Sequence, residues 1–200
     1  MPERLSQIPL FPLHTVLYPG GPLPLRIFEP RYLDMISRCL KADSPFGILL
    51  IRDGIEAGQS TTYEVGTLAR IADWYQGSDG VLGITVVGEK RFRLLSNDRQ
   101  ADGLCIGEIE IIEDEGSSPL PKEFKQVAEI LATILGNLDR LYDFLDENYE
   151  DASWVGYRFA EILPIEPMKK QWCLETNDPF ERLRVVSKVL KAVGGVEKLA

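Results

Sequence analysis

The 200-residue sequence is poor in the side chains that metal sites and hydrolytic sites most often use. His14 is the single histidine, which excludes an HExxH zinc site and leaves a Ser-His-Asp triad dependent on one residue in an apolar, proline-bound segment. The three cysteines, Cys39, Cys105 and Cys173, lie far apart, which excludes a CxxC metal knuckle and a complete set of disulfides. No glycine is followed by lysine, so the GxxxxGK(S/T) phosphate loop is also missing. We expect no metal and no cofactor.

Basic residues and long apolar runs are scarce as well. The formal net charge is −9, and this disfavours a general nucleic-acid binder, because neutralising phosphates requires a basic face. A local patch at Lys90, Arg91 and Arg93 is more readily explained as a solvated strand face. No stretch approaches the about 20 apolar residues of a membrane helix, and the amino terminus MPERLSQ lacks the apolar core of a signal peptide. We therefore expect a cytoplasmic protein with no membrane partner.

Proline, by contrast, is concentrated in one stretch near the amino terminus. Six of the thirteen prolines lie between Ile8 and Tyr32, among many large apolar residues. Proline removes a backbone donor and disrupts helices, while the apolar content is too high for a disordered linker. We predict short extended segments here, over residues 10–13, 15–18 and 23–28, followed by a helix that begins at Pro30 with Glu29 as its cap.

The chain up to residue 113 is predicted to be β-rich, with that single helix. Further strands are expected over residues 46–52, 62–73, 81–87, 91–95 and 105–113, with loops over 53–61 and 96–104. The first of these is apolar throughout, which indicates burial on both faces. Gly66, inside a strand, predicts a bulge or a close backbone approach. Residues 76–80 predict a hairpin turn, and residues 88–90 predict a further turn.

Helical periodicity replaces the β pattern after the glycine- and serine-rich stretch 114–121. We predict one long helix over residues 122–145, a second capped by Ser153 over 154–163, and a short third over 168–175. A fourth is predicted from the cap Asp178 and Pro179 to Gly194 and Gly195. The composition thus divides the chain into a β subdomain, 1–118, and a helical subdomain, 119–200.

Several stretches, in the same order along the chain, resemble the amino-terminal substrate-binding domain of the Lon proteases. They are PLFPLHTVLYPGGPLPLRIFEPRY, PFGILLI, GTLARIADW, GEKRFRLL and LPIEPMKKQWCLETNDPFERL. The resemblance implies an α+β fold, in which a twisted β pseudo-barrel like that of PUA-type domains carries one helix and precedes a helical bundle. It also implies that the chain recognises unfolded or damaged polypeptide in bacterial protein quality control. Because the ATPase and Ser-Lys protease domains of that family have no counterpart in the sequence, we expect no enzyme activity.

Candidate binding residues follow from this resemblance and from exposed aromatic positions. Arg26, Glu29, Arg31 and Tyr32 match the family's signature stretch, although capping and pairing at the start of the helix already account for Glu29 and Arg31. Two further candidates, Trp74 and Tyr75, precede a polar turn and could form a contact patch; packing of Trp74 against a neighbouring element is the favoured alternative.

Two questions about partners stay open at this point. A separate protease or chaperone, and a second copy of the chain in a homo-oligomer, are both compatible with the sequence. The alternative function is a PUA-like module for RNA or a small ligand. A contiguous basic groove through Arg70, Lys90, Arg91 and Arg93 would favour that alternative, and an acidic face would disfavour it.

Overall fold

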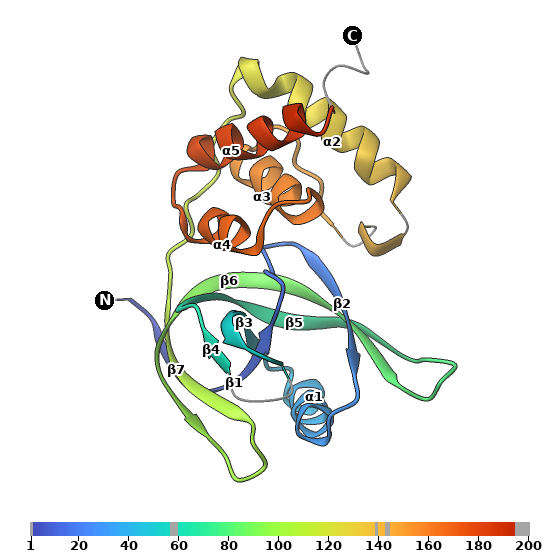
Figure 1. The fold of residues 1–200 in the computed structure, drawn as a ribbon, viewed down its shortest axis with the longest axis vertical. Coiled ribbons are helices and arrows are strands. Elements are labelled where there is room, and N and C mark those ends of the chain that lie inside the picture. Colours follow the sequence, from blue (N-terminus) through green and yellow to red (C-terminus); the bar gives the residue numbers. More distant parts are fainter. Residues whose placement is uncertain (1, 57–59, 139, 143–144, 195–200) are drawn as a thin grey trace. The chain divides into compact units, whose positions relative to one another are not determined.

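The computed structural model describes residues 2–56, 60–138, 140–142 and 145–194, and it divides the chain into two compact units (Figure 1). Unit 1 comprises Met1–Asp114 and unit 2 comprises Glu115–Ala200. The division falls four residues before the boundary predicted at 118. The glycine- and serine-rich stretch is not a linker, because Glu115, Ser117 and Ser118 bind side chains of unit 2.

Unit 1 is a ring of strands with one helix. Strands β1, β7, β6, β5 and β3 pair in that order, and a parallel pairing of β3 with β1 closes the ring. β4 extends the sheet from β3, and β2 pairs with β6. The elements are β1 (Arg4–Leu13), β2 (Pro22–Ile27), α1 (Pro30–Ala42), β3 (Phe46–Gly54), β4 (Ser60–Thr62), β5 (Val65–Gln76), β6 (Leu82–Arg99) and β7 (Cys105–Ile111).

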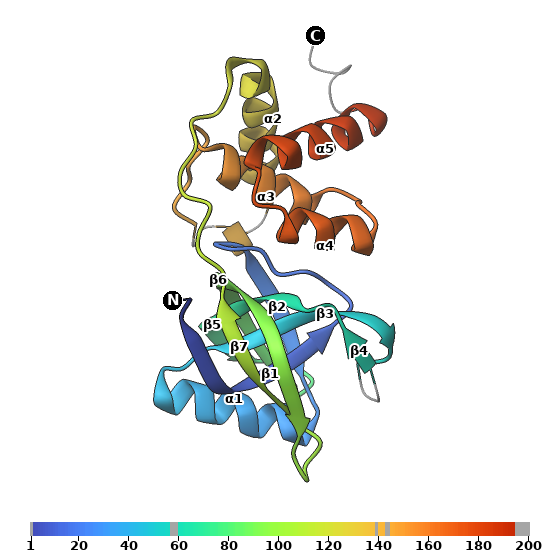
Figure 2. The same cartoon turned by 90° about the vertical axis from the view of Figure 1, so that its left-hand side faces the viewer.

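The strands of unit 1 contribute to two separate apolar cores. Leu10, Leu49 and Phe92 belong to one cluster, and their chain neighbours Phe11 and Ile48 belong to the other. Successive strand residues point to opposite faces, so β1 and β3 are buried on both sides. The second cluster includes the buried face of α1, which lies along one side of the ring (Figure 2). This confirms the prediction that the run beginning at Phe46 is a strand buried on both faces.

Gly66 is placed where the ring has no room for a side chain. A Cβ at this position would lie 2.3 Å from the Ile48 carbonyl oxygen and 2.8 Å from the Phe92 ring. The glycine therefore permits the predicted close backbone approach.

The turn predicted at residues 88–90 is wrong, because β6 is continuous from Leu82 to Arg99. Its first part pairs with β2 and β5, and its second part pairs with β5 and β7. Gly88 is required by a distant contact, since a Cβ there would lie 2.1 Å from the Tyr18 carbonyl oxygen. The strand predicted over residues 15–18 is also absent; this segment has no regular structure, although Thr67 donates a hydrogen bond to the Leu17 carbonyl at 2.6 Å.

The start of α1 is as predicted. Glu29 has extended backbone angles at the N-cap position, and Pro30 is the first helical residue. The Glu29 side chain makes no capping hydrogen bond; its backbone carbonyl accepts from Tyr32 and Leu33 instead. Predicted loop boundaries shift in two places. β4 covers the end of the expected loop 53–61 and the first residue of the strand expected over 62–73, and β6 extends to Arg99.

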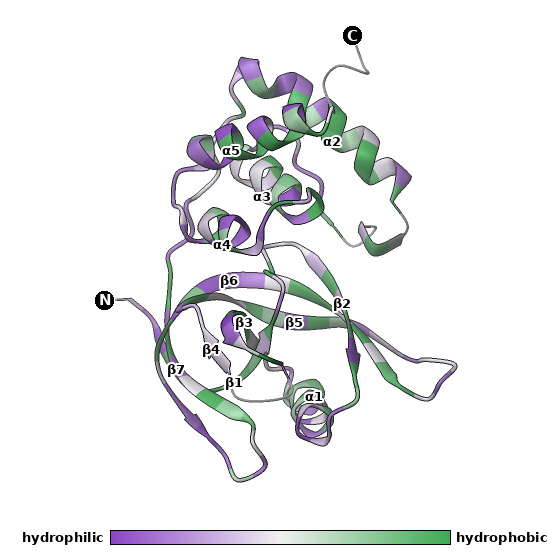
Figure 3. Cartoon of the chain, in the orientation of Figure 1, coloured by the Kyte–Doolittle hydropathy of each residue, from purple (hydrophilic) through white to green (hydrophobic). Residues whose placement is uncertain are grey.

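Unit 2 is made of short helices that carry both hydrophobic and hydrophilic residues (Figure 3). They are η1 (Lys122–Phe124), α2 (Lys125–Asn137), η2 (Arg140–Tyr142), α3 (Ala152–Ile162), α4 (Pro167–Glu175) and α5 (Pro179–Ala192). The long helix predicted over 122–145 ends at Asn137, because Leu138 is extended after the weak helix formers Gly136 and Asn137. Asp178 caps α5 as predicted; Gly195 lies outside the described residues.

The predicted cap of α3 is corrected from Ser153 to Asp151. The Asp151 carboxylate accepts a hydrogen bond from the Trp154 backbone N–H at 2.8 Å and a second from the Ser118 N–H at 2.9 Å. An ionised carboxylate is a stronger acceptor than a serine hydroxyl at the positive end of a helix, so α3 begins at Ala152. Asp151 thereby also holds the segment that enters unit 2.

Candidate functional site

A groove in unit 1 runs beside β2, and we call it the β2 groove. It has a volume of about 250 Å³. Residues 23–28 line one wall. The rest comes from β1, the segment after it, the start of α1 and the segment after β3, with Phe11, Leu13, Thr15, Glu29, Tyr32 and Glu56. Along β2, hydrophobic residues alternate with the two prolines and Arg26 (Figure 3). The Phe11 and Tyr32 rings stack in the groove with centroids 4.0 Å apart, so the lining is partly aromatic and combines apolar side chains with polar ones such as Thr15 and Glu56.

The three predicted residues at the start of α1 form a rigid corner. Arg31 pairs with Glu29 at 2.7 Å, donates to the Gly103 carbonyl at 3.0 Å, and lies over the Tyr32 ring. Burial raises the pKa of Tyr32 to about 12, so its phenol stays protonated at neutral pH. Glu29 and Tyr32 line the groove. Arg31 does not line it, and its contacts fix the position of the corner. The ion pair agrees with the pairing expected of Glu29 and Arg31, whereas the expected side-chain cap of Glu29 is not formed.

Arg26 and Tyr75 lie on the outer face of the sheet, in one row across three strands. Both residues pair with Gly83 of β6, Arg26 from β2 and Tyr75 from β5. The Tyr75 ring covers Gly83, where a Cβ would lie 2.3 Å from the ring. The Arg26 guanidinium forms an ion pair with Asp79 of the hairpin turn, and these residues line a depression of about 300 Å³. Arg26 therefore borders both this depression and the β2 groove.

Trp74 does not share a face with Tyr75, because adjacent strand residues point in opposite directions. It pairs with Ile84 and so lies on the core side, the side to which Leu25 of the groove belongs. Trp74 is 59% exposed and Tyr75 is 50% exposed. The packed alternative favoured for Trp74 is therefore wrong. The two exposed aromatics therefore lie on opposite faces of the sheet rather than in one patch.

Two groove residues escaped the sequence-based search. Phe28, directly after β2, is 70% exposed, although its place in an apolar stretch of the sequence is typical of a core residue. Glu56 follows β3 in what was predicted to be an ordinary surface loop, and its carboxylate accepts a hydrogen bond from the His14 backbone N–H at 2.9 Å. Only the tertiary fold brings them to the groove. A phenylalanine directly before a helix cap was the one available signal.

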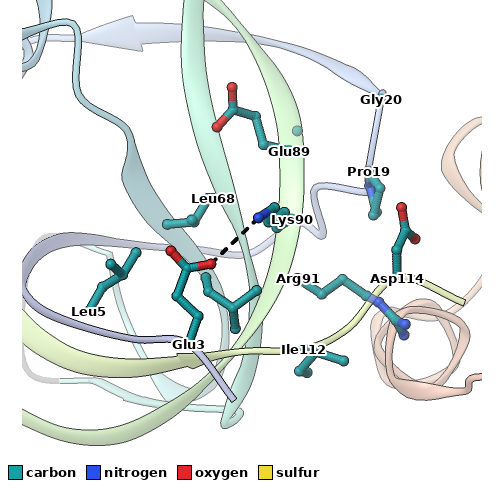
Figure 4. A pocket seen from close by; sticks show the side chains of 12 residues that line it. Glu3, Leu5, Pro19, Gly20, Leu68, Glu89, Lys90, Arg91, Ile112 and Asp114 are labelled. Carbon is teal, nitrogen blue, oxygen red and sulfur yellow. Dashed lines mark ion pairs between the residues drawn. The ribbon is translucent and has the colours of Figure 1, made fainter. Parts of the chain in front are cut away.

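The basic groove that would favour RNA binding does not form at Arg70, Lys90, Arg91 and Arg93. Lys90 and Arg91 line a second cavity of unit 1, of about 560 Å³, together with Glu3, Glu89 and Asp114. Figure 4 shows Lys90 paired with Glu3, at 3.6 Å. The other two arginines of the set are paired as well, Arg70 with Glu89 and Arg93 with Glu64, and Arg91 is buried. The cavity therefore offers mixed charge and does not suit a polyanion.

Neither a metal cluster nor a membrane helix is found where the structure describes the chain. No group of three or more His, Cys, Asp or Glu side chains in that part is arranged to hold a metal ion. Among the same residues, none of the helices combines the length and the apolar character that crossing a lipid bilayer requires.

Comparison with known proteins identifies the class to which this ring and its helices belong. Residues 7–192 match the family described as the ATP-dependent protease La (LON) substrate-binding domain. The chain belongs to this family, which confirms the resemblance seen in the sequence.

Individual relatives agree with this assignment. The crystal structure of a Lon N-terminal domain protein from Xanthomonas campestris is 35% identical, with a TM-score of 0.75 over 92% of this chain and 98% of that one. The N-terminal domain of a Mycobacterium avium complex Lon protease shares the fold, with 19% identity and a TM-score of 0.63 over 94% of this chain and 98% of that one. Lon protease 2 of Myxococcus xanthus is 26% identical over 99% of this chain. The chain spans about a quarter of the length of the curated Lon proteases it matches.

Proposed function

We propose that unit 1 binds exposed segments of unfolded or damaged polypeptide in the β2 groove. The observation that carries the proposal is the exposed Phe28 beside a groove whose lining includes the Phe11–Tyr32 stack, in a chain of the substrate-binding family. Exposed apolar surface of this kind is typical of interaction sites. Unfolded chains expose apolar side chains that folded proteins bury, so the groove would select for the unfolded state.

This role requires no chemistry in the bound chain. We propose that the module acts without hydrolysis and without ATP, in the cytoplasm, and that a protease or chaperone receives the bound polypeptide. The ion-paired cations at Arg70, Lys90 and Arg93 weigh against the alternative role in binding RNA.

A titration with a permanently unfolded protein, such as reduced and carboxymethylated lactalbumin, tests the proposal. We expect micromolar or weaker binding, and no binding of the folded, disulfide-bonded form. Replacing Phe28 by alanine should weaken binding by about tenfold, because a phenylalanine side chain contributes about 1.5 kcal/mol or more when it is buried by a ligand. The matched control is Leu95→Ala, which removes an exposed apolar side chain of unit 1 outside the groove.

Two results would refute the proposal. The first is the absence of binding to any denatured protein. The second is a Phe28→Ala variant that binds no more weakly than Leu95→Ala, which would place the contact elsewhere on the molecule.

A further inference from the structure

The outer edge of β2 has an unusual set of backbone groups. Within residues 2–56 and 60–114, β6 is the only strand that pairs with β2. Pro22 and Pro24 have no N–H, so the ladder with β6 must use the N–H groups of the alternate residues, Leu23, Leu25 and Ile27. The backbone groups of Pro22, Pro24 and Arg26 consequently point away from β6. Pro22 is buried, so the open part of the edge presents two carbonyl acceptors, those of Pro24 and Arg26, and one donor, the Arg26 N–H.

This edge borders the β2 groove. Residues 23–28 all line the groove, and the Phe11 and Tyr32 rings lie on its other side. An extended chain in the groove would lie beside β2, with every second side chain toward the apolar rings. Strand addition of this kind supplies affinity through backbone hydrogen bonds, which do not depend on the sequence of the bound segment.

The charges around the groove favour a cationic ligand. Arg26 is paired with Asp79, and Arg31 is paired with Glu29. Glu56 lines the groove, and none of the ion pairs found between described residues includes its carboxylate, which accepts only the His14 backbone N–H. The whole chain carries a net charge of −9, which also attracts positive segments.

We propose that an extended polypeptide segment adds to β2 as a further strand and carries a lysine or arginine that pairs with Glu56. The segment donates alternate N–H groups to the carbonyls of Pro24 and Arg26 and accepts one hydrogen bond from the Arg26 N–H. This mode rests on the proposed function and specifies its substrate: an apolar, extended and basic segment with unblocked N–H groups.

The prolines explain why a client segment, rather than a second copy of β2, is the occupant. A client offers an N–H at every non-proline residue, whereas the edge of a second β2 has only that of Arg26 to donate. Proline on an edge strand protects against pairing between sheets. The edge thus discriminates against self-association while it accepts chains rich in donors.

Blocked peptides test the backbone contacts. The probe is a short fluorescein-labelled peptide with leucine or phenylalanine at every second position, threonine between them and one terminal lysine, followed by fluorescence anisotropy. Two variants carry N-methyl groups, one at all apolar positions and the other at all threonines. Because the N–H groups of alternate residues point to the same side, only one set should weaken binding, by about tenfold for two lost hydrogen bonds.

The affected set also reports the strand direction. Loss with the threonine set indicates an antiparallel segment, and loss with the apolar set indicates a parallel one, since directly opposite residues share a face in both cases. Equal affinities of the two methylated peptides would overturn strand addition. If both methylated peptides bind as well as the unmethylated probe, strand addition is wrong but the proposed function still holds. If neither the unmethylated probe nor any denatured protein binds, the proposed function itself is refuted.

A matched pair of variants tests the single donor of the edge. Arg26→Ala removes the side chain and keeps the N–H, whereas Arg26→Pro removes both and leaves the β6 ladder intact. We expect Arg26→Pro to bind the probe several-fold more weakly than Arg26→Ala, with similar thermal unfolding of the two variants. Equal binding by two equally stable variants would contradict the proposed donor.

The charge contact is tested by a double-mutant cycle. Glu56→Gln and a peptide with norleucine in place of lysine should each weaken binding by about threefold, the size expected of a partly exposed ion pair. The two changes together should weaken binding no more than either one alone. Strictly additive effects would show that the lysine does not contact Glu56.

Discussion

Unit 1 and unit 2 differ in where they keep their charged groups. The ion pairs of unit 1 lie mostly at the surface, as with Arg93 and Glu64, and its two cores are apolar. Unit 2 buries two arginines completely, Arg158 and Arg182. Arg182 donates to both oxygens of Glu115, at 2.6 and 2.9 Å, and its guanidinium covers the Tyr157 ring.

The difference predicts that the two units are sensitive to different kinds of substitution. A unit built around apolar strands should respond most to changes in volume. A unit that encloses an ion pair should respond most to the loss of one partner, because the other partner is then left charged and buried. Four predictions test this contrast.

The largest effect is expected for Arg182→Met in unit 2. Its removal leaves the Glu115 carboxylate, which is 2% exposed, without its partner, so we expect a loss of about 3–5 kcal/mol in the free energy of unfolding. Urea denaturation followed by tryptophan fluorescence measures it, in a Trp74→Phe background where Trp154 and Trp172 report unit 2 alone. The double variant with Glu115→Gln should recover part of the loss. A loss below about 1 kcal/mol would remove the contrast between the units.

A smaller but still large effect is expected for Gly66→Ala in unit 1. The new methyl group would meet the Ile48 carbonyl oxygen and the Phe92 ring, and we expect destabilisation of about 3 kcal/mol from overpacking. Fluorescence of Trp74, with the other two tryptophans replaced by phenylalanine, measures unfolding of unit 1. The control is Gly136→Ala in α2 of unit 2, measured with Trp154 and Trp172 in the Trp74→Phe background. No atom beyond its own helix backbone and chain neighbours lies within 4 Å of the added group, and a gain of up to about 1 kcal/mol is expected. Equal effects at both sites would contradict tight packing in the ring.

Two helix caps of unit 2 provide the third test. Asp178→Ala should cost about 1 kcal/mol, the usual contribution of a cap. Asp151→Ala should cost about 2 kcal/mol, because Asp151 also accepts hydrogen bonds from the Ser117 hydroxyl and the Ser118 N–H. Thermal unfolding monitored by circular dichroism compares the two variants. If both lose the same stability, the additional bonds of Asp151 contribute nothing.

The smallest effect is expected for the surface arginine Arg93. Arg93→Ala breaks a pair with Glu64 in which both side chains are at least half exposed, so stability should change by less than about 0.5 kcal/mol. Arg4→Ala, which breaks a pair with the less exposed Glu110, serves as the comparison. Denaturation in low and high salt should give similar values. A loss above about 2 kcal/mol would mean that surface pairs also support the ring.

Features decided by neighbouring residues could be predicted from the sequence. Glu29 and Pro30 begin α1, and Asp178 and Pro179 begin α5, because a cap and a proline act within one turn. Gly88 was misinterpreted as a turn, because the sequence contains no sign of the Tyr18 carbonyl that lies against it. The apolar stripe after α2 likewise suggested a longer helix, although Gly136 and Asn137 end it.

The candidate site depended even more on distant contacts. Arg26, Glu29 and Tyr32 could be selected because they match the family's signature stretch, and they do line the β2 groove. The partner of Arg26, Asp79, lies 53 positions later and becomes visible only once β2 and the hairpin are folded. The opposite orientations of Trp74 and Tyr75 follow from strand register, which the sequence alone did not establish.

The Glu115–Arg182 pair has a practical consequence for dissecting this chain. Composition suggests cutting at residue 119, but a fragment starting there would lack the only carboxylate that Arg182 contacts among the described residues. It would also lose the two serines that bind Asp151. A helical fragment intended for separate expression should therefore start no later than Glu115, and insolubility of a shorter one would say nothing about whether these helices fold independently.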